Sequence, residues 1–347
     1  MHLLLAYVAV FGAALGASLV ATPIARGLAR RWGVLDQPSH RKVHHDPTPL
    51  LGGLAVYAAF WLAVLLVSRL EIAAPEVFLP AATRELGAIF LATLTLLAMG
   101  FVDDKYKHTF GGVPPRAKLA GQLLAATVAL LGGLQFHVFG SQVADVLLTV
   151  LWIIGISNAI NFLDNMDGLS AGATAIASLF FALLAALHGQ ILVASMALAL
   201  AGACFGFLRY NFNPASVFMG DAGTLFMGFL LSVIGLKLNV SGPAWWSFAL
   251  VAVVLALPIF DTSLVTAHRL LTGRHVAQGG KDHTSHRLVK LGLPHKGAVL
   301  VLYGASIAAG TLAVTLSQWG QGLAQVLMLP AIAVALTAGL LLGRVET

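Results

Sequence analysis

The sequence predicts an all-α, polytopic membrane protein, and three observations carry this prediction. Of its 347 residues, 59% are hydrophobic and only 10% are charged, whereas a soluble domain has about 25% charged residues. Apolar runs of roughly 17 to 22 residues, long enough to cross a bilayer as a helix, recur along the whole chain. Lysine and arginine gather in every second connection between these runs. We therefore expect a single transmembrane domain over residues 1–347.

About 11 transmembrane helices are predicted from these runs. The first run is interpreted as a helix rather than a signal peptide, because no lysine or arginine precedes it and Arg26, Arg30 and Arg31 follow it. A short break at His188-Gly189-Gln190 separates the sixth run from the seventh. In chain order, the predicted helices cover residues 3–22, 50–68, 85–102, 118–136, 144–160, 169–187, 191–208, 222–239, 245–266, 298–316 and 324–342.

Charge determines the predicted orientation. With the N-terminus outside and strict alternation, 17 of the 20 lysines and arginines fall on the inner side, which satisfies the positive-inside rule and makes the C-terminus cytoplasmic. The same assignment places every aspartate except Asp145 on that side, although no aspartate was used to make it. We expect a multi-pass protein of the inner (plasma) membrane with an active site facing the cytoplasm. Its loops would lie near residues 23–49, 103–117, 158–168, 209–221 and 267–297.

Cysteine and charge exclude several classes of site. The only cysteine, Cys204, lies in an apolar run, which excludes a disulfide framework and a cysteine-rich metal site. A net charge of +6 in a membrane protein fits anionic lipids or substrates better than nucleic acid.

Asp103 and Asp104 close the third apolar run. Adjacent helical residues diverge by about 100°, so the two carboxylates are not equivalent. One is able to bind a cation while the other faces a substrate, and carboxylate together with phosphate oxygen is the usual way to hold Mg²⁺. A solvated helix end is the alternative interpretation.

Four polar residues repeat every three positions between the fifth and sixth runs: Asn158, Asn161, Asp164 and Asp167. A helical turn would stack them on one face, and such a patch suits a sugar, a nucleoside or a hydrated cation. The alternative is a capped turn between two helices, which accounts for one of these residues but not for four.

Asp221 stands at the start of the eighth run, with Gly220 and Gly223 on either side. Glycine permits close backbone approach, and a helix N-terminus favours anions. An ordinary helix cap is the alternative.

Two inner loops are basic. Loop 267–297 holds His283 and His286 together with six lysines and arginines, which suits a pyrophosphate. Zinc is conceivable there, but the acids elsewhere in the chain suit a harder ion. Loop 23–49 is ordered by proline and glycine, and its candidate phosphate ligands are Arg41, Lys42 and His44. For both loops the alternative is a basic segment that only sets topology.

The sequence combines acids that suit a divalent cation, basic residues that suit phosphates, and membrane helices around both. Together these features predict phosphoryl transfer at a membrane surface. Such catalysis consists mostly of positioning and charge neutralisation. The substrates would be one water-soluble phosphate compound and one lipid.

These motifs resemble the polyprenyl-phosphate N-acetylhexosamine-1-phosphate transferases, or glycosyltransferase family 4. The resemblance runs from Leu35 to Gly292 in five ordered blocks. These are Leu35-Asp36-x-Pro38 through Arg41-Lys42-x-His44 to Gly52-Gly53, Asp103-Asp104 with Lys118, Asn158 through Gly168, Gly220-Asp221-Ala222-Gly223, and the histidine loop.

The resemblance implies a reaction and a set of roles. A UDP-N-acetyl sugar would give its sugar 1-phosphate to polyprenyl (undecaprenyl) phosphate and release UMP, the first membrane step of cell-envelope polysaccharide synthesis. Asp103, Asp104 and Asp221 would be catalytic and would surround Mg²⁺, for which Mn²⁺ could substitute. Asp103 would keep the lipid phosphate deprotonated or attack directly. The substrate-binding residues would be Asn158, Asn161, Asp164, Asp167, Lys118, Arg41, Lys42, His44, His283 and His286.

Within the family, Asp164-Asn-Met-Asp167-Gly-Leu-Ser is similar to the bacterial N-acetylglucosamine branch. The muramoyl-pentapeptide branch, which usually reads Asp-Gly-Leu-Asp-Gly-Leu-Ala there, is the alternative. The chain reads His283-Thr284-Ser285-His286 where the family often has His-x-His-His. The resemblance also leaves a homodimer open.

A transporter of a divalent cation or phosphate compound is the alternative from another class, since it too would use intramembrane acids. Transporter sites, however, lie near the bilayer midplane and often between internal repeats. Here the acids lie at segment ends, and no repeat is found. A purely structural membrane scaffold would leave the polar loops unexplained.

Overall fold

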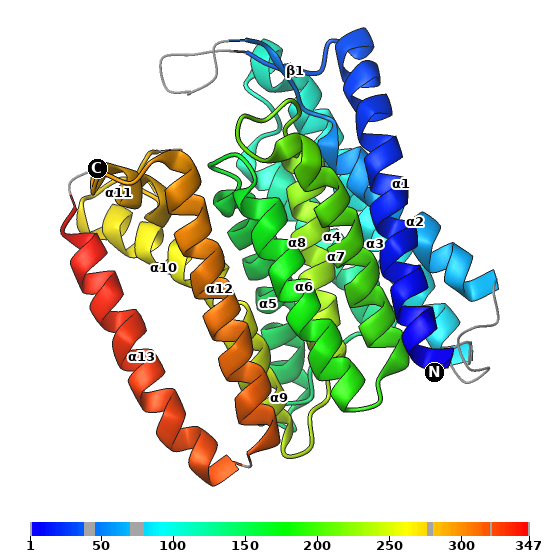
Figure 1. Cartoon of the computed structure of the whole chain (residues 1–347), viewed down its shortest axis with the longest axis vertical. Helices are drawn as coiled ribbons and strands as arrows, with labels where there is room; N and C mark the ends of the chain where they lie inside the picture. Colours follow the sequence, from blue (N-terminus) through cyan, green and yellow to red (C-terminus); the bar gives the residue numbers. More distant parts are fainter. Residues whose placement is uncertain (1, 38–45, 70–79, 276–279, 320, 346–347) are drawn as a thin grey trace.

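The computed structural model describes residues 2–37, 46–69, 80–275, 280–319 and 321–345, whose helices pack side by side (Figure 1). The all-α prediction is confirmed, because each apolar run lies largely within a helix. The helices are α1 (His2–Trp32), α2 (Gly52–Arg69), α3 (Pro80–Phe110), α4 (Pro115–Leu131), α5 (Gln142–Leu163), α6 (Leu169–Leu187), α7 (Ile191–Asn211), α8 (Gly220–Lys237), α9 (Ala244–Val254), α10 (Ala256–Leu271), α11 (Thr284–Lys290), α12 (His295–Gln318) and α13 (Gln321–Gly343).

Seven of the described helices are long and apolar enough to cross a membrane, or eight if the pair α9 and α10, bent by 75°, counts as one span. The prediction of about 11 spans also included α2, α4 and α13. α4 has only 17 residues, and the apolar parts of the other two are the shorter stretches Gly52–Leu66 and Ile332–Gly343. A polytopic membrane protein is confirmed, whereas the count of 11 and the orientation stay predictions.

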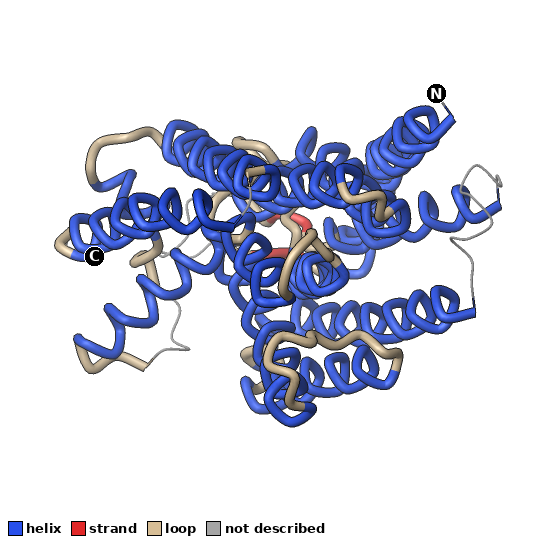
Figure 2. Tube along the Cα trace, turned by 90° about the horizontal axis from the view of Figure 1, so that it is seen from below, coloured by secondary structure: helices blue, strands red, loops and turns tan. Residues whose placement is uncertain are grey.

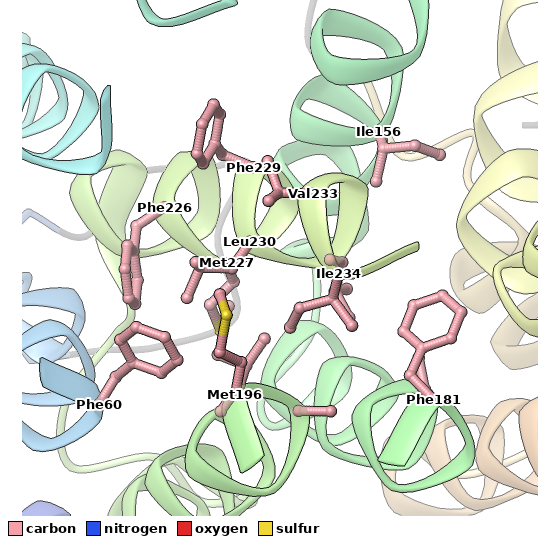
Figure 3. Close-up of a cluster of buried hydrophobic side chains, with 14 of the residues drawn as sticks. Phe60, Ile156, Phe181, Met196, Phe226, Met227, Phe229, Leu230, Val233 and Ile234 are labelled. Atoms are coloured by element: carbon pink, nitrogen blue, oxygen red, sulfur yellow. The ribbon is translucent and has the colours of Figure 1, made fainter. Parts of the chain in front are cut away.

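α8 is the centre of the bundle, with 83% of its apolar window buried against 22% for α1. Its side chains Phe226 and Ile234 pack among Phe60 of α2, Ile156 of α5 and Met196 of α7 (Figure 3). Large apolar side chains on the outer helices point away from the bundle instead, where lipid is as favourable a neighbour as protein. A buried, fixed α8 gives the residues at its N-terminus a fixed position.

A glycine brings α3 against the first turn of α8. A Cβ atom added to Gly100 would lie 2.3 Å from the backbone nitrogen of Ala222, so no larger residue fits without moving one helix. Asp103 and Asp104 follow one turn later on α3. The close approach at Gly100 therefore carries both carboxylates to the N-terminus of α8.

The polar connections meet at one end of the bundle, opposite the N-terminus (Figure 1). The described strands, β1 (Leu35–Asp36) and β2 (Thr48–Pro49), pair antiparallel there, and they lie near the middle of the bundle when it is viewed end-on (Figure 2). Asp145 lies in the first turn of α5, about 27 Å from the opposite end of that helix at 1.5 Å per residue. The predicted gathering of the other aspartates at one end agrees with this arrangement.

Helices extend further than the apolar runs predicted. α1 continues to Trp32 and α3 to Phe110, so the loops near 23–49 and 103–117 are shorter than expected. Hydropathy ends a segment at the first charged residue, but a helix continues outside the apolar layer wherever charged side chains reach water. Asp103 and Asp104 consequently lie inside a helix.

Candidate active site

Three acids from two helices form what we call the carboxylate cluster: Asp103 and Asp104 of α3 and Asp221 of α8. One oxygen of each lies within 4.8 Å of an oxygen of the other two. The Asp103 side chain is 3% exposed and that of Asp221 is 15% exposed. The repulsion between buried acids that lie so close must be offset by nearby cations or hydrogen-bond donors.

Asp103 and Asp104 have different partners, as their divergence on the helix predicts. Asp104 accepts the backbone N–H groups of Asp221 at 2.9 Å and Ala222 at 3.1 Å, so it caps the first turn of α8 from another helix. Asp103 accepts the N–H of Val113 at 2.6 Å and faces Lys118 with its other oxygen. Asp221 is therefore held by a cap that α3 supplies.

Two lysines neutralise part of the cluster. Lys118 Nζ lies 2.8 Å from Asp103 Oδ2 and 2.6 Å from Asp221 Oδ2. Lys107 Nζ lies 3.7 Å from Asp221 Oδ1. The sequence analysis did not single out Lys107, although its position four residues after Asp103 places both on one helix face. Three carboxylates against two lysines leave a surplus negative charge.

The donor chemistry of the carboxylate cluster fits a divalent cation. Carboxylate oxygens are the ligands that hard cations prefer, and each oxygen that accepts one hydrogen bond retains a lone pair. The cluster therefore provides an oxygen-rich, negatively charged position for a metal ion.

The four polar residues that were predicted to stack at the end of α5 do not share one face. Asn158 pairs with Gln122 of α4 through hydrogen bonds of 2.9 and 3.1 Å and is absent from the lining of the cleft described below. Asn161 donates to Thr224 Oγ1 of α8 at 2.7 Å. Because α5 ends at Leu163, Asp164 and Asp167 belong to the turn beyond it.

Both acids in this turn accept hydrogen bonds. Asp164 accepts the hydroxyl of Ser170, but burial dominates and raises the pKa of Asp164 to about 6. Asp167 Oδ2 accepts Asn213 Nδ2 at 2.9 Å and the N–H of Ala215 at 3.0 Å. The turn is thereby tied to α6 and to the connection between α7 and α8.

Gly168 closes the turn in a conformation that favours glycine, with φ 80°. Its N–H donates to Asn211 Oδ1 at 3.0 Å, and its carbonyl accepts the hydroxyl of Tyr303 at 2.5 Å. Both backbone groups of this residue are thus held by side chains of other helices, α7 and α12.

One cleft of about 700 Å³ connects part of these groups, and Asp103, Asp104 and Lys118 are not among the residues that line it. It extends from Asp221 and Lys107 past the α5–α6 turn to His286. Its full lining comprises Asp36, Asp46, Thr48, Leu50, Lys107, Asn161, Asp164, Asn165, Met166, Asp167, Asn211, Asn213, Pro214, Ala215, Phe218, Gly220, Asp221, Lys281, His286, His295 and Val299.

The histidine segment, residues 280–290, is held by matched acids. Asp261 Oδ2 lies 2.8 Å from His283 Nδ1, and Asp261 Oδ1 accepts the N–H of Thr284 at 2.7 Å. Asp261 is not among the residues that line the cleft, and it instead positions His283 and the start of α11.

A second acid holds the same segment. Asp282 binds Arg269 through two hydrogen bonds of 2.8 and 2.7 Å. Burial opposes ionisation of Asp282, but Arg269 outweighs it and holds the carboxyl pKa below its usual range. Arg287 is fully buried and donates to the carbonyls of Leu342 and Val345 at 2.7 and 2.9 Å, which ties the segment to the end of α13.

The two predicted histidines have different environments. His286 lines the cleft, whereas His283 does not. Burial and then the neighbouring charges of His283 and Lys281 lower the pKa of His286 to about 4. His286 is thus neutral at pH 7.

The structure brings some predicted residues together and leaves others apart. Arg41, Lys42 and His44 lie outside the described residues. Sequence reasoning missed several residues that line the cleft: Lys107, Asn165, Asn211, Asn213, Lys281 and His295. A lone asparagine in a connection carries no signal of its own, because asparagine is common in turns.

Known proteins resemble this chain over most of its length. A probable undecaprenyl-phosphate N-acetylglucosaminyl 1-phosphate transferase of Bacillus subtilis is 34% identical over 82% of this chain and 78% of the relative. A decaprenyl-phosphate N-acetylglucosaminephosphotransferase of Mycolicibacterium smegmatis is 35% identical over 82% and 75%. The model of glycosyl transferase family 4 matches residues 86–239.

The chain belongs to glycosyl transferase family 4. The matched region of this family contains the whole carboxylate cluster and the α5–α6 turn. A phospho-N-acetylmuramoyl-pentapeptide-transferase of Streptococcus pneumoniae is 29% identical over 74% of this chain and 79% of the relative. The predicted family is therefore confirmed, and the protein is a membrane-embedded transferase.

Proposed function

We propose that this protein transfers N-acetylglucosamine 1-phosphate from UDP-N-acetylglucosamine to polyprenyl phosphate and releases UMP. The observation that carries the proposal is the carboxylate cluster with its two lysines, because Asp221 and Lys107 of this group line one cleft together with the α5–α6 turn and the neutral His286. Acids for a cation, cations for phosphates and hydrogen-bonding groups for a nucleotide sugar all meet at that one space.

The reaction exchanges one phosphoanhydride for another. An oxygen of the lipid phosphate attacks the β-phosphorus of the UDP-sugar, the bond from that phosphorus to the bridging oxygen breaks, and UMP leaves with that oxygen. One phosphoanhydride bond breaks and another forms, so the step is readily reversible. Catalysis then depends on positioning and on neutralising phosphate charge.

The carboxylate cluster would hold Mg²⁺, with Mn²⁺ able to replace it. When bound, such an ion supplies charge neutralisation at the pyrophosphate. Asp104 orients the N-terminus of α8, and Lys107 and Lys118 offer ammonium groups to phosphate oxygens. Asp103 either keeps the lipid phosphate deprotonated or itself attacks the UDP-sugar; both roles require one of its oxygens to reach the substrate.

The sugar and nucleotide would bind along the α5–α6 turn. Asn161, Asp164 and Asp167 line the cleft next to Asp221 and offer acceptors for hydroxyl and imide hydrogens. His286, neutral at pH 7, and Lys281 approach from the histidine segment. We also propose that phosphate is bound by Arg41, Lys42, His44 and His283. Asn158 would support this site indirectly, through its contact with α4.

The choice of N-acetylglucosamine follows the relatives and the sequence of the turn. Relatives named for that sugar are 34% and 35% identical to this chain, and the one named for the muramoyl pentapeptide is 29% identical. The positive-inside distribution supports an active site that faces the cytoplasm at the plasma membrane.

The test is a panel of UDP-sugars offered to the purified protein with polyprenyl phosphate and Mg²⁺, with lipid products identified by mass. We expect the mass of polyprenyl diphosphate N-acetylglucosamine. A product only with UDP-N-acetylmuramoyl pentapeptide would support the other branch. No lipid product with any donor would contradict the proposal, and cation flux into proteoliposomes without UMP would favour a transporter.

A further inference from the structure

Side-chain contacts join α4, α5 and α8 into a closed ring beside the carboxylate cluster. One lysine–carboxylate contact of 2.6 Å connects α4 to α8, a hydrogen bond of 2.7 Å connects α8 to α5, and a pair of amides connects α5 back to α4. In each helix the two members lie about one turn apart and so share a face. In order around the ring, the residues are Lys118, Asp221, Thr224, Asn161, Asn158 and Gln122.

The orientation of the amide pair is determined by a group that only accepts hydrogen bonds. Asn158 Nδ2 donates to the backbone carbonyl of Ile154 at 2.8 Å, and a carbonyl cannot donate in return. With Asn158 fixed in this way, it donates to Gln122 Oε1 at 2.9 Å and accepts from Gln122 Nε2 at 3.1 Å. Both hydrogens of Asn158 Nδ2 are used, so Asn158 has no donor left for a substrate, and it does not line the cleft.

Gln122 is the polar member of a buried helix face that otherwise consists of alanines. The buried residues of α4 are Gln122, Ala125, Ala126 and Ala129. Small residues let helices approach closely, but their methyl groups do not determine how far one helix slides or turns against the next. A buried amide pair does, as a single buried asparagine sets the register of a coiled coil. In the described part of the chain, this pair provides the hydrogen bonds between side chains of α4 and α5.

The register of α4 matters because of Lys118, which lies one turn before Gln122 on that helix. Its ammonium group reaches acids on two other helices at once, Asp103 Oδ2 at 2.8 Å and Asp221 Oδ2 at 2.6 Å. The N-terminus of α4 has no side-chain cap that would hold it in place. The register that Gln122 sets is therefore the one at which Lys118 meets both carboxylates.

We propose that Asn158 is a positioning residue, which places Lys118 between Asp103 and Asp221 by fixing Gln122 and with it α4. It is not a ligand of the nucleotide or the sugar, the role that the resemblance implies for it. This inference rests on the proposed function and deepens it, because Lys118 offers one of the two ammonium groups to the phosphates. A misplacement of about 1 Å at such a group costs up to roughly 10²-fold in rate.

The experiment measures kcat/KM for UMP release from UDP-N-acetylglucosamine, with polyprenyl phosphate and Mg²⁺, together with the unfolding temperature. Asn158→Leu and Gln122→Met replace each amide by an apolar side chain of similar size. We expect each to lower kcat/KM about tenfold and to lower the unfolding temperature, because the partner amide is left unpaired. The matched control is Gln142→Met. Gln142 and Gln135 form the same kind of reciprocal pair at the other end of α5, at 3.2 and 3.3 Å, so kcat/KM should stay unchanged there.

Two combined variants separate positioning from folding and from substrate binding. When Asn158→Leu and Gln122→Met are combined, neither amide is left unpaired, so the unfolding temperature should recover while kcat/KM stays about tenfold low. In a Lys118→Met background, Asn158→Leu should lower kcat/KM by less than about twofold, because the group that Asn158 positions is already gone.

The outcomes distinguish this inference from the proposed function. If Gln122→Met leaves kcat/KM unchanged, or if Asn158→Leu costs as much in the Lys118→Met background as in the wild type, the inference is wrong and the proposed function stands. Recovery of kcat/KM together with the unfolding temperature in the combined variant would also overturn the inference, since the pair would then serve folding alone. If the wild type forms no lipid product, the proposed function itself fails.

Discussion

The carboxylate cluster and the histidine segment lie at the same cleft but are built differently. The cluster has three acids for two lysines, and the lysine side chains are 45% and 29% exposed. In the histidine segment each acid has its own base: Asp282 has Arg269, which is 4% exposed, and Asp261 has His283, which is 8% exposed. One region carries surplus charge that reaches the cleft through Asp221 and Lys107, whereas in the other region each buried acid is paired with a base.

The difference separates chemistry from positioning. A surplus of carboxylate charge that reaches the cleft through Asp221 attracts a cation and its phosphate ligands, so the loss of that charge should remove activity with little change in folding. Removing half of a buried matched pair leaves the other half uncompensated. Substitutions in the histidine segment should therefore affect activity and stability together.

The largest effect is expected for Asp221→Asn, which removes a charge from the carboxylate cluster and keeps the size of the side chain. We predict a fall in kcat of about 10³-fold, the order seen when electrostatic stabilisation of a transition state is lost. Asp145→Asn is the matched control, because Asp145 is buried at the other end of α5 and caps the N–H groups of Val138 and Phe139.

The control should lose thermal stability and retain kcat once folded. If Asp221→Asn and Asp145→Asn had the same kcat, the carboxylate cluster would not be the centre of the chemistry.

A smaller effect is expected for Asp261→Asn. The amide retains an acceptor for the N–H of Thr284 but opposes His283 Nδ1 with an N–H donor, so it disturbs the tautomer or orientation of the imidazole. By comparison with other residues that orient a functional histidine, kcat/KM should fall about 10- to 100-fold. Steady-state kinetics and thermal unfolding in detergent measure both consequences. Unchanged kcat/KM in a folded variant would mean that the position of His283 has no bearing on turnover.

The histidine segment should also make stability depend on pH. The pKa of His286 is about 4 in the folded protein against 6.5 for a free histidine, so between these values the unfolded chain binds more protons. This contribution to stability is fully present above pH 6.5 and is lost as pH falls toward 4. The unfolding temperature should drop across this range, and less steeply in His286→Gln. Parallel curves for the two proteins would contradict the assignment.

The smallest effect is expected for Tyr303→Phe, which removes the hydroxyl that binds the carbonyl of Gly168. A hydrogen bond of this kind contributes about 1 kcal/mol. The free energy of unfolding should fall by that order, with a modest rise in KM for the UDP-sugar because the α5–α6 turn is less firmly held. A loss of kcat as large as that of Asp221→Asn would instead make Tyr303 part of the catalytic machinery.

Much of the fold was predictable because hydropathy and charge act locally along the chain. Apolar runs located the helices, and the lysine and arginine count located the end that carries Asp103, Asp104 and Asp221. The 75° bend between α9 and α10 was not predicted, because Pro258 lies in an otherwise continuous apolar run. Helix ends were missed for another reason, because hydropathy does not report where a helix stops in water.

The site was predictable where several acids or amides are close in sequence, and not where partners are distant. The Asp104 cap on α8 and the pairing of Asp261 with His283 join residues that only tertiary packing brings together. The hydrogen bond between Asn165 and Ser285 joins residues 120 positions apart, and neither is a conspicuous residue type. Such contacts arise from the close approach of α3 to α8 and from the docking of α11.

The central claim is that the carboxylate cluster supports metal-dependent phosphoryl transfer. The most direct measurement is UMP release from UDP-N-acetylglucosamine as a function of Mg²⁺ concentration, with and without polyprenyl phosphate, in the wild type and in Asp221→Asn. The account predicts release only when both Mg²⁺ and the lipid are present, and its near-complete loss in the variant. Release that persists in chelator, or that is the same in Asp221→Asn, would contradict it.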